Sequence, residues 1–264
     1  MSAQSAPVLF VMIDGLRPDA LAHCDCPTLA SLRARGASTL NARSVMPSVT
    51  LPCHMSIFHS VPPTRHGVTT NDWQPMARPL PGLIDVAKDN GLRCAAIYNW
   101  EPLRNLSRPE KLDAVYFRDC STAEDGDDWV ASAAIHHLTT YPTDFAFVYF
   151  GTVDTSGHHY GWMSDGYLRQ AERVDRNLAR LLEALPSDYH MIIQADHGGH
   201  ERGHGTEMAE DMTIPWLVVG PSIRRGYTIT EAVSLIDTAP TLARLLNLPR
   251  HRDWEGRSVD EAFV

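Results

Sequence analysis

Residues 191–205 bring several metal-ligating side chains together in one short stretch. Four of the six residues from Met191 to Asp196 are apolar, which predicts a buried strand that ends at Asp196. The glycine-rich turn that follows carries three histidines, His197, His200 and His204. Neighbouring side chains of a regular strand point to opposite faces, so Asp196 and His197 can face one ion only where the strand gives way to this turn. The stretch predicts metal chemistry at a strand end, with histidines gathered by chance in a surface loop as the alternative.

Asp14 and Asp154 follow two further predicted strands. Residues 8–13 and 145–150 are continuous apolar runs, typical of strands buried on both faces. Ligands of open α/β sheets bind outside the carboxyl ends of strands, so both carboxylates are candidates for one site. For Asp14 the alternative is a cap of a helix over residues 18–23. Asp154 is four residues from His158, a spacing that lets a loop or a first helical turn present both to one ion, and His158 is preferred over its neighbour His159.

Thr50 is predicted to cap a helix that has Pro52 in its first turn. A simple cap is one role for Thr50. A hydroxyl at a helix N-terminus also sits where an alkoxide and a phosphate are stabilised, as a nucleophile for phosphoryl transfer requires. Cys53 is a rival nucleophile, but inside the helix and without a partnered base we expect it to be a core residue. Asn71 follows a turn-rich loop, and its amide can donate to a phosphoryl oxygen.

These residues supply more ligands than one tetrahedral zinc can use. Carboxylate oxygens and imidazoles without a thiolate suit zinc, with manganese or iron next. Two ions roughly 4 Å apart, bridged by the Thr50 oxygen, would use all of the ligands and supply a clamp for an in-line displacement at phosphorus. The candidate metal ligands are Asp14, Thr50, Asp154, His158, Asp196, His197 and His204.

The elements that must position these residues alternate along the chain. Strands are predicted at residues 8–13, 39–45, 94–98, 145–150, 191–196 and 214–219, and helices at 27–35, 83–90, 129–140, 165–185 and 235–246. This alternation favours a largely parallel sheet with helices on both faces, an α/β three-layer sandwich. Since α/β folds of more than 200 residues often form one unit, we expect a single domain over residues 1–264.

The composition and charge of the chain limit the class of protein, the partners and the cellular location that we expect. Apolar residues make up 44% and charged residues 21% of the chain, as in ordinary soluble globular proteins. A net charge of −9 argues against nucleic-acid polymers and anionic membranes as partners. The five cysteines lack Cys-x-x-Cys spacing, so we expect free thiols and a reducing compartment. The N-terminus has no basic segment and its apolar run is too short for a signal sequence, which favours a cytoplasmic location. The sequence does not decide between a monomer and a homodimer.

At these residues the chain resembles the alkaline phosphatase superfamily, and most closely its type I phosphodiesterase/nucleotide pyrophosphatase branch. The match runs in order over most of the chain: residues 13–15 with 17–19, 47–54, 66–67 with Asn71, Asp154 with Gly157-His158, 196–198, and 204–205 followed by 211–212 and 220–221. The resemblance implies the alkaline-phosphatase-like fold. It also implies one metal on Asp154, His158 and His204, a second on Asp14, Asp196 and His197, Thr50 as nucleophile between them, and Asn71 as an amide that binds the phosphoryl oxygens.

Three departures from the branch concern the region that selects the substrate. Asp196 and His204 are only eight residues apart, where the branch has a long insertion. Leu51 stands where members that stack a nucleobase have an aromatic residue. The Trp-Pro-Gly segment of the branch appears only as Trp100-Glu101-Pro102. The resemblance therefore carries the metal site but not nucleotide selectivity.

The resemblance and the residues together predict a two-metal phosphohydrolase for small phosphate esters. Diesters or pyrophosphates are the expected substrates, cleaved through a phospho-threonine at Thr50. Phosphomonoesterases, phosphonate hydrolases and phosphomutases of the superfamily are alternatives, and Arg17 or Arg65 would matter if the substrate carried an extra negative charge. A metal-binding protein without catalysis is a further alternative, but it has no need for a hydroxyl at the helix start. We expect His200 to lie behind the ligands or at the cleft mouth rather than on a metal.

Overall fold

The computed structural model describes residues 6–186 and 188–264, and the strands among them form one eight-stranded sheet. The strand order is β4-β3-β5-β1-β6-β7-β2-β8. Only β7 runs antiparallel to its neighbours, so the largely parallel sheet predicted above is confirmed. The strands are β1 (Val8–Ile13), β2 (Ala37–Arg43), β3 (Cys94–Tyr98), β4 (Ala114–Phe117), β5 (Phe145–Phe150), β6 (His190–Gln194), β7 (Thr213–Val219) and β8 (Tyr227–Thr228).

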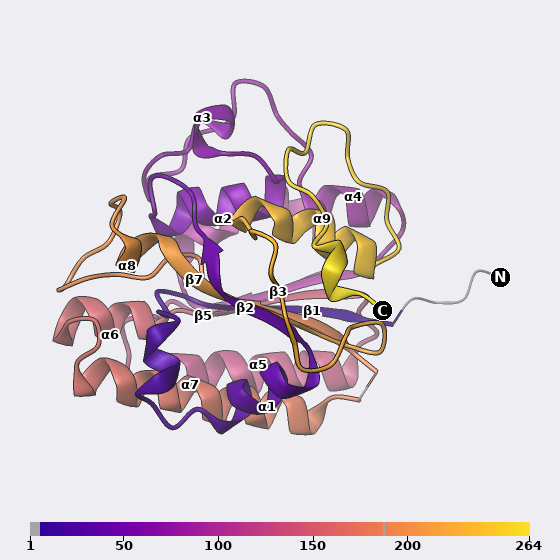
Figure 1. The fold of residues 1–264 in the computed structure, drawn as a ribbon. Helices are drawn as coiled ribbons and strands as arrows, with labels where there is room; N and C mark the ends of the chain where they lie inside the picture. Colours follow the sequence, from indigo (N-terminus) through magenta and orange to yellow (C-terminus); the bar gives the residue numbers. More distant parts are fainter. Residues whose placement is uncertain (1–5, 187) are drawn as a thin grey trace.

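Helices cover both faces of the sheet, which confirms the three-layer sandwich. Figure 1 shows α2, α4 and α9 above the sheet and α1, α5 and α7 below it. The α-helices are α1 (Pro27–Arg35), α2 (Thr50–His59), α3 (Pro63–His66), α4 (Leu83–Asp89), α5 (Gly126–Thr140), α6 (Thr152–Tyr160), α7 (Asp165–Ala184), α8 (Ala209–Met212) and α9 (Thr238–Leu245). Short 3₁₀ helices are η1 (Asp19–Ala22), η2 (Glu101–Leu106), η3 (Pro109–Lys111), η4 (Leu235–Asp237) and η5 (Asp260–Ala262). Within the described residues, no helix is long and apolar enough to span a bilayer.

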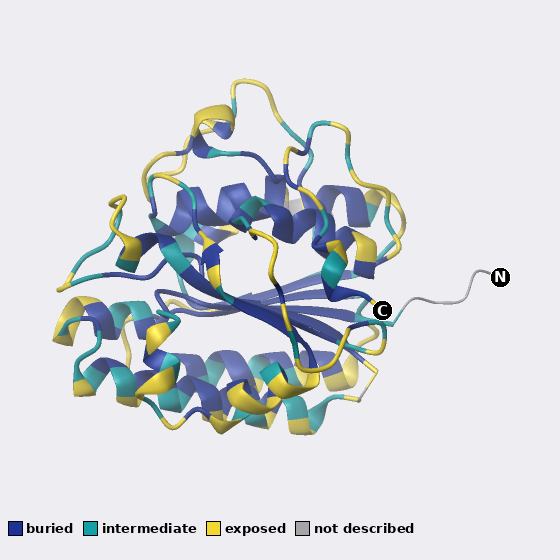
Figure 2. Cartoon of the chain, in the orientation of Figure 1, coloured by how far each residue is buried: buried dark blue, intermediate teal, exposed yellow. Residues whose placement is uncertain are grey.

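The centre of the sheet is buried on both faces. Every residue of β1, β5 and β6 is buried. The continuous apolar runs predicted this burial for β1 and β5. Figure 2 shows these strands in dark blue between the helices. Three phenylalanines join the sheet to α2. The ring centroids of Phe10 and Phe147 are 5.4 Å apart, and Phe58 of α2 lies 5.9 Å from the first and 5.0 Å from the second. This packing fixes α2 over the middle strands.

Several element boundaries differ from those predicted; β6, for example, ends at Gln194 rather than at Asp196. Three of the differences have a clear physical reason. The strand expected at residues 39–45 lies at 37–43, because it pairs antiparallel with β7 from Ala37 to Arg43. The helix expected from Trp129 begins at Gly126, where the chain packs so closely on the Cys120 carbonyl that a side chain would not fit. The helix expected at residues 235–246 is divided into η4 and α9, because Asp237 accepts from the Ser234 amide and closes a separate first turn.

The parallel register brings the candidate ligands to one edge of the sheet. Ile13 is paired with Phe150, and Met12 with Gln194, so β1, β5 and β6 end side by side. Residues that follow these strands directly in sequence must therefore leave the sheet at the same place. The β1 turn, the start of α6 and the loop after β6 all begin there.

We expect Gly157→Ala to destabilise the fold although alanine is the better helix former. A Cβ at Gly157 in α6 would lie 2.6 Å from the ring of Trp162, and Trp162 is fixed because its Nε1 donates to the Gly15 carbonyl at 3.0 Å. Overpacking of this kind costs roughly 1–3 kcal/mol. Thermal unfolding at fixed metal content measures the effect. Gly203→Ala is the matched control, since no atom lies within 4 Å of its added Cβ, and equal melting temperatures for the two variants would contradict the expectation.

Candidate functional site

The six carboxylates and imidazoles selected from the sequence form two clusters at the carboxyl edge of the sheet. Within each cluster, one ligand atom per residue lies within 4.8 Å of the others. The first cluster is Asp154, His158 and His204, and the second is Asp14, Asp196 and His197. The membership of each cluster is the one that the family resemblance implies.

The second cluster is the more deeply buried. Its three residues are each at most 1% exposed. His197 Nε2 lies 3.2 Å from Asp14 Oδ1 and 3.5 Å from Asp196 Oδ2, so one ring nitrogen faces both carboxylates. The other Asp196 oxygen accepts from the backbone amides of Gly15 at 3.2 Å and His197 at 3.0 Å. The other Asp14 oxygen accepts from the hydroxyl of Tyr149, which is also buried.

The first cluster lies nearer the surface. Asp154 Oδ2 is 3.5 Å from His158 Nε2, and Asp154 Oδ1 is 3.6 Å from His204 Nε2. Asp154 and His158 occupy α6, and their separation of one helical turn places them on one side of that helix. The His204 ring stacks on His197, with centroids 3.8 Å apart and planes 12° apart, so the two clusters are in direct contact.

Backbone carbonyls orient all three imidazoles of the two clusters. In each ring Nδ1 donates to a carbonyl, so Nε2 is the ring nitrogen that faces the carboxylates. The bonds are His158 to Arg202 at 2.9 Å, His197 to Gly198 at 2.7 Å and His204 to Ser48 at 2.8 Å. This tautomer is the one in which a histidine binds a metal through Nε2.

In the two clusters, three carboxylate oxygens have no hydrogen-bond donor among the described residues: Asp14 Oδ1, Asp154 Oδ1 and Asp196 Oδ2. All three are buried, one from each acidic residue. Leaving such a group without a partner costs roughly 1–3 kcal/mol, and more for a charged group. The unpartnered oxygens therefore mark places where the protein lacks positive charge of its own.

The electrostatics of the clusters show the same deficit. Burial and the negative charge of Asp14 raise the pKa of Asp154 to about 7. Burial and Asp14 likewise raise the pKa of Asp196 well above its usual range. Burial would also raise the pKa of Asp14, but the adjacent His197 lowers it to about 2. Burial opposes the charge of His197, yet Asp196 and Asp14 raise its pKa to about 10. Without added positive charge, Asp154 and Asp196 are therefore hard to ionise, and the cationic His197 ring balances the charge of Asp14.

Thr50 lies against the second cluster, where its Oγ1 is 3.2 Å from His197 Nε2. The prediction that Thr50 caps α2 is wrong: it is the first helical residue, and Val49 occupies the cap position in an extended conformation. Asn71 provides the capping instead, because its Oδ1 accepts from the Leu51 amide at 3.0 Å. The Thr50 hydroxyl is therefore available to the site, and Asn71 stands beside it with its amide nitrogen uncommitted to this bond.

Cys53 does not compete with Thr50. Its side chain is fully buried in α2, and burial together with the charge of Asp196 raises the pKa of the thiol well above its usual range. His54, also buried, donates from Nδ1 to the Thr50 carbonyl at 2.8 Å. Both residues therefore support the start of α2, in agreement with the core role expected for Cys53.

His200 lies outside both clusters. Its Nδ1 donates to Asp211 Oδ1 at 2.7 Å, and this bond raises the pKa of His200. The other Asp211 oxygen accepts from the amide and the hydroxyl of Thr206 at 2.9 and 2.8 Å. Asp211 is fully buried, so it clamps the loop that carries His204 from both sides. His200 therefore lies behind the clusters, as expected, because it is bound to the buried Asp211.

Sequence reasoning missed two residues that hold the ligands in place. Tyr149 is the one hydroxyl in the otherwise apolar run of β5, and its place just before the strand end could have signalled a bond to the site. Asp127 is buried at the start of α5 and accepts from the Gly151 and Thr152 amides at 3.0 and 3.1 Å, so it fixes the start of α6, which carries Asp154. No local pattern around Asp127 indicates a contact 24 residues away.

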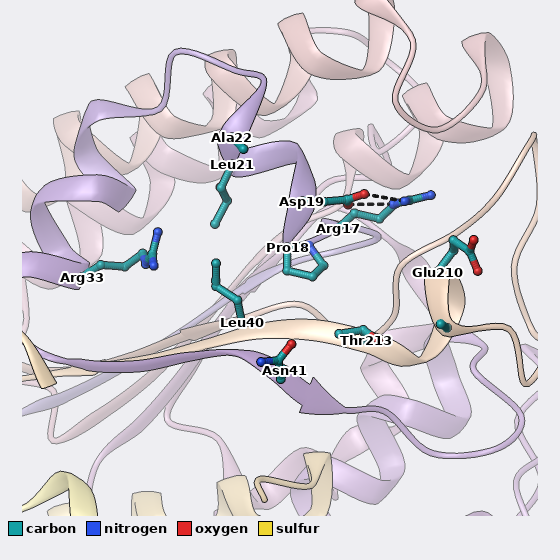
Figure 3. A pocket seen from close by; sticks show the side chains of 11 residues that line it. Arg17, Pro18, Asp19, Leu21, Ala22, Arg33, Leu40, Asn41, Glu210 and Thr213 are labelled. Carbon is teal, nitrogen blue, oxygen red and sulfur yellow. Dashed lines mark hydrogen bonds and ion pairs between the residues drawn. The ribbon is translucent and has the colours of Figure 1, made fainter. Parts of the chain in front are cut away.

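A cavity of about 580 Å³ lies beside the metal-ligand loop rather than over it. Figure 3 shows Leu21 and Arg33 facing Leu40 in this cavity, with the paired Arg17 and Asp19 at its other end. Its lining, within the described residues, includes none of the six ligands. Arg17 connects the two regions, because its guanidinium donates to the Gly199 carbonyl at 3.0 Å.

Comparison with known proteins agrees with this geometry. Residues 8–210 match the family model for type I phosphodiesterase/nucleotide pyrophosphatase. A 2,3-bisphosphoglycerate-independent phosphoglycerate mutase of Acinetobacter baylyi is 32% identical over 137 residues, which cover 49% of this chain and 26% of the mutase. A venom phosphodiesterase of Naja atra is 23% identical over 219 residues, which cover 73% of this chain and 26% of the relative. The matched segment is thus about a quarter of either relative's length.

Solved structures share the fold at low sequence identity. Murine ectonucleotide pyrophosphatase/phosphodiesterase 5 superposes with a TM-score of 0.78 at 18% identity, over 92% of this chain and 95% of the other. A 2-O GAG sulfatase superposes with a TM-score of 0.79 at 14% identity, over 97% and 73%. With the family match over residues 8–210, the chain belongs to the type I phosphodiesterase/nucleotide pyrophosphatase family, a branch of phosphoryl-transfer enzymes in the alkaline phosphatase superfamily.

Proposed function

We propose that the protein is a two-metal phosphohydrolase that cleaves phosphodiester or pyrophosphate bonds of small molecules through a phospho-threonine at Thr50. The observation that carries this proposal is the position of the Thr50 hydroxyl, 3.2 Å from a ring nitrogen of the second cluster and at the start of a helix. A protein that only stored metal would have no use for a hydroxyl there.

The residues of the two clusters fit a pair of divalent ions. Each cluster offers carboxylate oxygens and imidazole Nε2 atoms without a thiolate, a set that suits zinc and also accommodates manganese. The unpartnered oxygens of Asp14, Asp154 and Asp196 are the atoms that would bind the ions. Two bound ions would lower the pKa of the Thr50 hydroxyl and neutralise the phosphoryl oxygens.

The protein groups define the order of the reaction. The Thr50 hydroxyl gives up its proton to solvent and its oxygen attacks phosphorus, the bond to the leaving group breaks, and the leaving oxygen takes up a proton from solvent. The Thr50 backbone amide at the start of α2 and the Asn71 amide nitrogen stabilise the charge on the phosphoryl oxygens. Water then attacks the phospho-threonine from the opposite side, which releases the phosphorylated product and restores Thr50.

The arginines near the site favour a diester over a monoester. A monoester carries an additional negative charge, which an arginine of the protein would have to balance. Arg17 donates from Nε and Nη2 to Asp19, at 2.9 and 2.5 Å, and from Nη1 to the Gly199 carbonyl. Arg65 is paired with Glu255 at 2.6 Å on the surface. Both guanidinium groups are thus already engaged elsewhere.

A phosphomutase is the second candidate, because the Acinetobacter relative above and a phosphopentomutase of Clostridioides difficile, 31% identical over 108 residues, are mutases. The candidate hydrolase activities are distinguished by comparing four substrates with added zinc or manganese: bis-p-nitrophenyl phosphate, p-nitrophenyl phosphate, a nucleotide sugar and a phosphonate. The proposal requires the diester or the nucleotide sugar to be the best substrate. A mutase would instead convert a sugar phosphate without releasing phosphate.

Thr50→Ala is expected to lower turnover of bis-p-nitrophenyl phosphate by roughly 10³-fold or more, because it removes the attacking oxygen and keeps the six ligands. Thr50→Ser retains a hydroxyl at the same place and is the matched control, for which we expect measurable activity. Elemental analysis should find two metal equivalents in both variants. A Thr50→Ala variant with the wild-type rate would rule out the covalent mechanism.

Chelation is expected to abolish activity and lower the melting temperature, because the three neighbouring carboxylates repel one another once the ions leave. Adding zinc or manganese should restore both properties. Calorimetry and the diester assay on the same samples test this. A chelated protein with unchanged activity and stability would show that the clusters bind no functional metal.

His204→Ala should cost one metal equivalent, since it removes a ligand from the more exposed cluster. His200→Ala should cost none, because His200 binds Asp211 rather than a cluster, and it should lower only the stability of the loop. Elemental analysis of both variants after identical loading distinguishes them. Metal loss from His200→Ala but not from His204→Ala would reverse the two assignments.

A further inference from the structure

Cys24 and Cys26 lie away from the metal clusters, on the link between η1 and α1. Their Sγ atoms are 2.7 Å apart. A disulfide bond is about 2.05 Å long, so the two sulfurs reach bonding distance with a small movement of the side chains. The remaining three cysteines are each buried at separate places in the fold, in α2, in β3 and before α5.

The backbone on both sides of the pair is held in place. The Cys24 amide donates to the Ala20 carbonyl at 3.0 Å, which ties it to η1. Cys26 is the residue before the first turn of α1, and Asp175 of α7 caps that turn by accepting from the Thr28 and Leu29 amides at 2.9 and 2.8 Å. Asp175 is only 1% exposed. The backbone of the link therefore holds the two cysteines in positions from which their sulfur atoms face each other.

The two thiols differ in exposure and in acidity. Cys24 is partly exposed, whereas Cys26 is buried behind it. The hydrogen bond between the two sulfurs lowers the pKa of Cys24, although burial acts in the opposite direction, and it raises the pKa of Cys26. By contrast, burial raises the pKa of Cys94 to about 12. Cys24 thus has the features of an attacking thiol, and Cys26 those of a resolving thiol.

We propose that Cys24 and Cys26 are a redox-reactive pair that forms a reversible disulfide by exchange with small-molecule disulfides such as glutathione disulfide. The Cys24 thiolate attacks one sulfur of glutathione disulfide, which forms a mixed disulfide and releases one glutathione. The Cys26 sulfur then attacks the Cys24 sulfur and releases the second glutathione. The two protein thiols are oxidised, one glutathione disulfide is reduced, and the two thiol protons leave on the two glutathione molecules. This site does not depend on the metal centre.

The test uses the whole protein, reduced with dithiothreitol, freed of it and incubated with glutathione disulfide under native conditions. We expect the intact mass to fall by two hydrogens, and two of the five thiols to become unreactive when titrated after unfolding. Peptide mapping should place the bond between Cys24 and Cys26. Dithiothreitol should restore all five thiols.

Two variants sharpen the result, and thermal unfolding confirms that each is folded. Cys26→Ser removes the resolving thiol, so Cys24 should retain one glutathione. Cys120→Ser, which removes a buried thiol outside the pair, should still form the bond. The wild-type measurement decides the matter even if a variant does not fold. The proposal would be overturned if the wild type kept all five thiols, retained a stable glutathione adduct, or formed a bond between other cysteines. It would also be overturned if the lost thiols were recovered with a chelator but not with dithiothreitol.

Discussion

The repulsion among three closely spaced carboxylates at one edge of the sheet, two of them buried and the third half-buried, is the constraint on which the site depends. Asp14, Asp154 and Asp196 stand where three parallel strands end together, and ionised groups in such a place are costly unless they are paired. The protein compensates part of the charge with the Tyr149 hydroxyl, backbone amides and the His197 ring. One oxygen of each carboxylate remains without a donor among the described residues, which supports the proposal that this edge of the sheet binds cations.

The surrounding structure fixes the positions of these candidate ligands. Backbone carbonyls of Ser48 and of the loop after β6 fix the imidazole rings, Asp127 fixes the start of α6, and Asp211 clamps the loop that holds His204. The opposite wall is the start of α2, which aromatic packing attaches to β1 and β5. Sheet, helices and loop thus fix one geometry, and few of the residues that do so are ligands.

The sequence was sufficient to predict six of the eight strands and the six residues that gather in the two clusters, but not β4, β8 or the residues that hold the clusters in place. Asp14 and Asp196 could be predicted because each follows an apolar run, a signal contained in neighbouring residues. The role of Asn71 at the start of α2 could not, because nothing in local spacing shows that a side chain 20 residues away will replace Thr50 as the cap. The Asp127 and Asp211 contacts also depend on loop paths, which hydrophobic periodicity does not determine. The contact between Cys24 and Cys26 was not predicted for a simpler reason: Cys-x-Cys differs from the spacing typical of metal sites.

The stacked rings of His197 and His204 have a consequence for how the site should be measured. The two rings belong to different clusters but share one short loop, and their centroids are 3.8 Å apart. Any shift or loss of a proton at one ring is therefore felt by the other. Thermodynamic linkage makes such an effect reciprocal, so the occupancy of either position changes the affinity at its neighbour by the same factor. If the two clusters each hold an ion, as proposed, the ions would not have independent binding constants, and a metal titration would have to be described by a stepwise scheme with a coupling free energy.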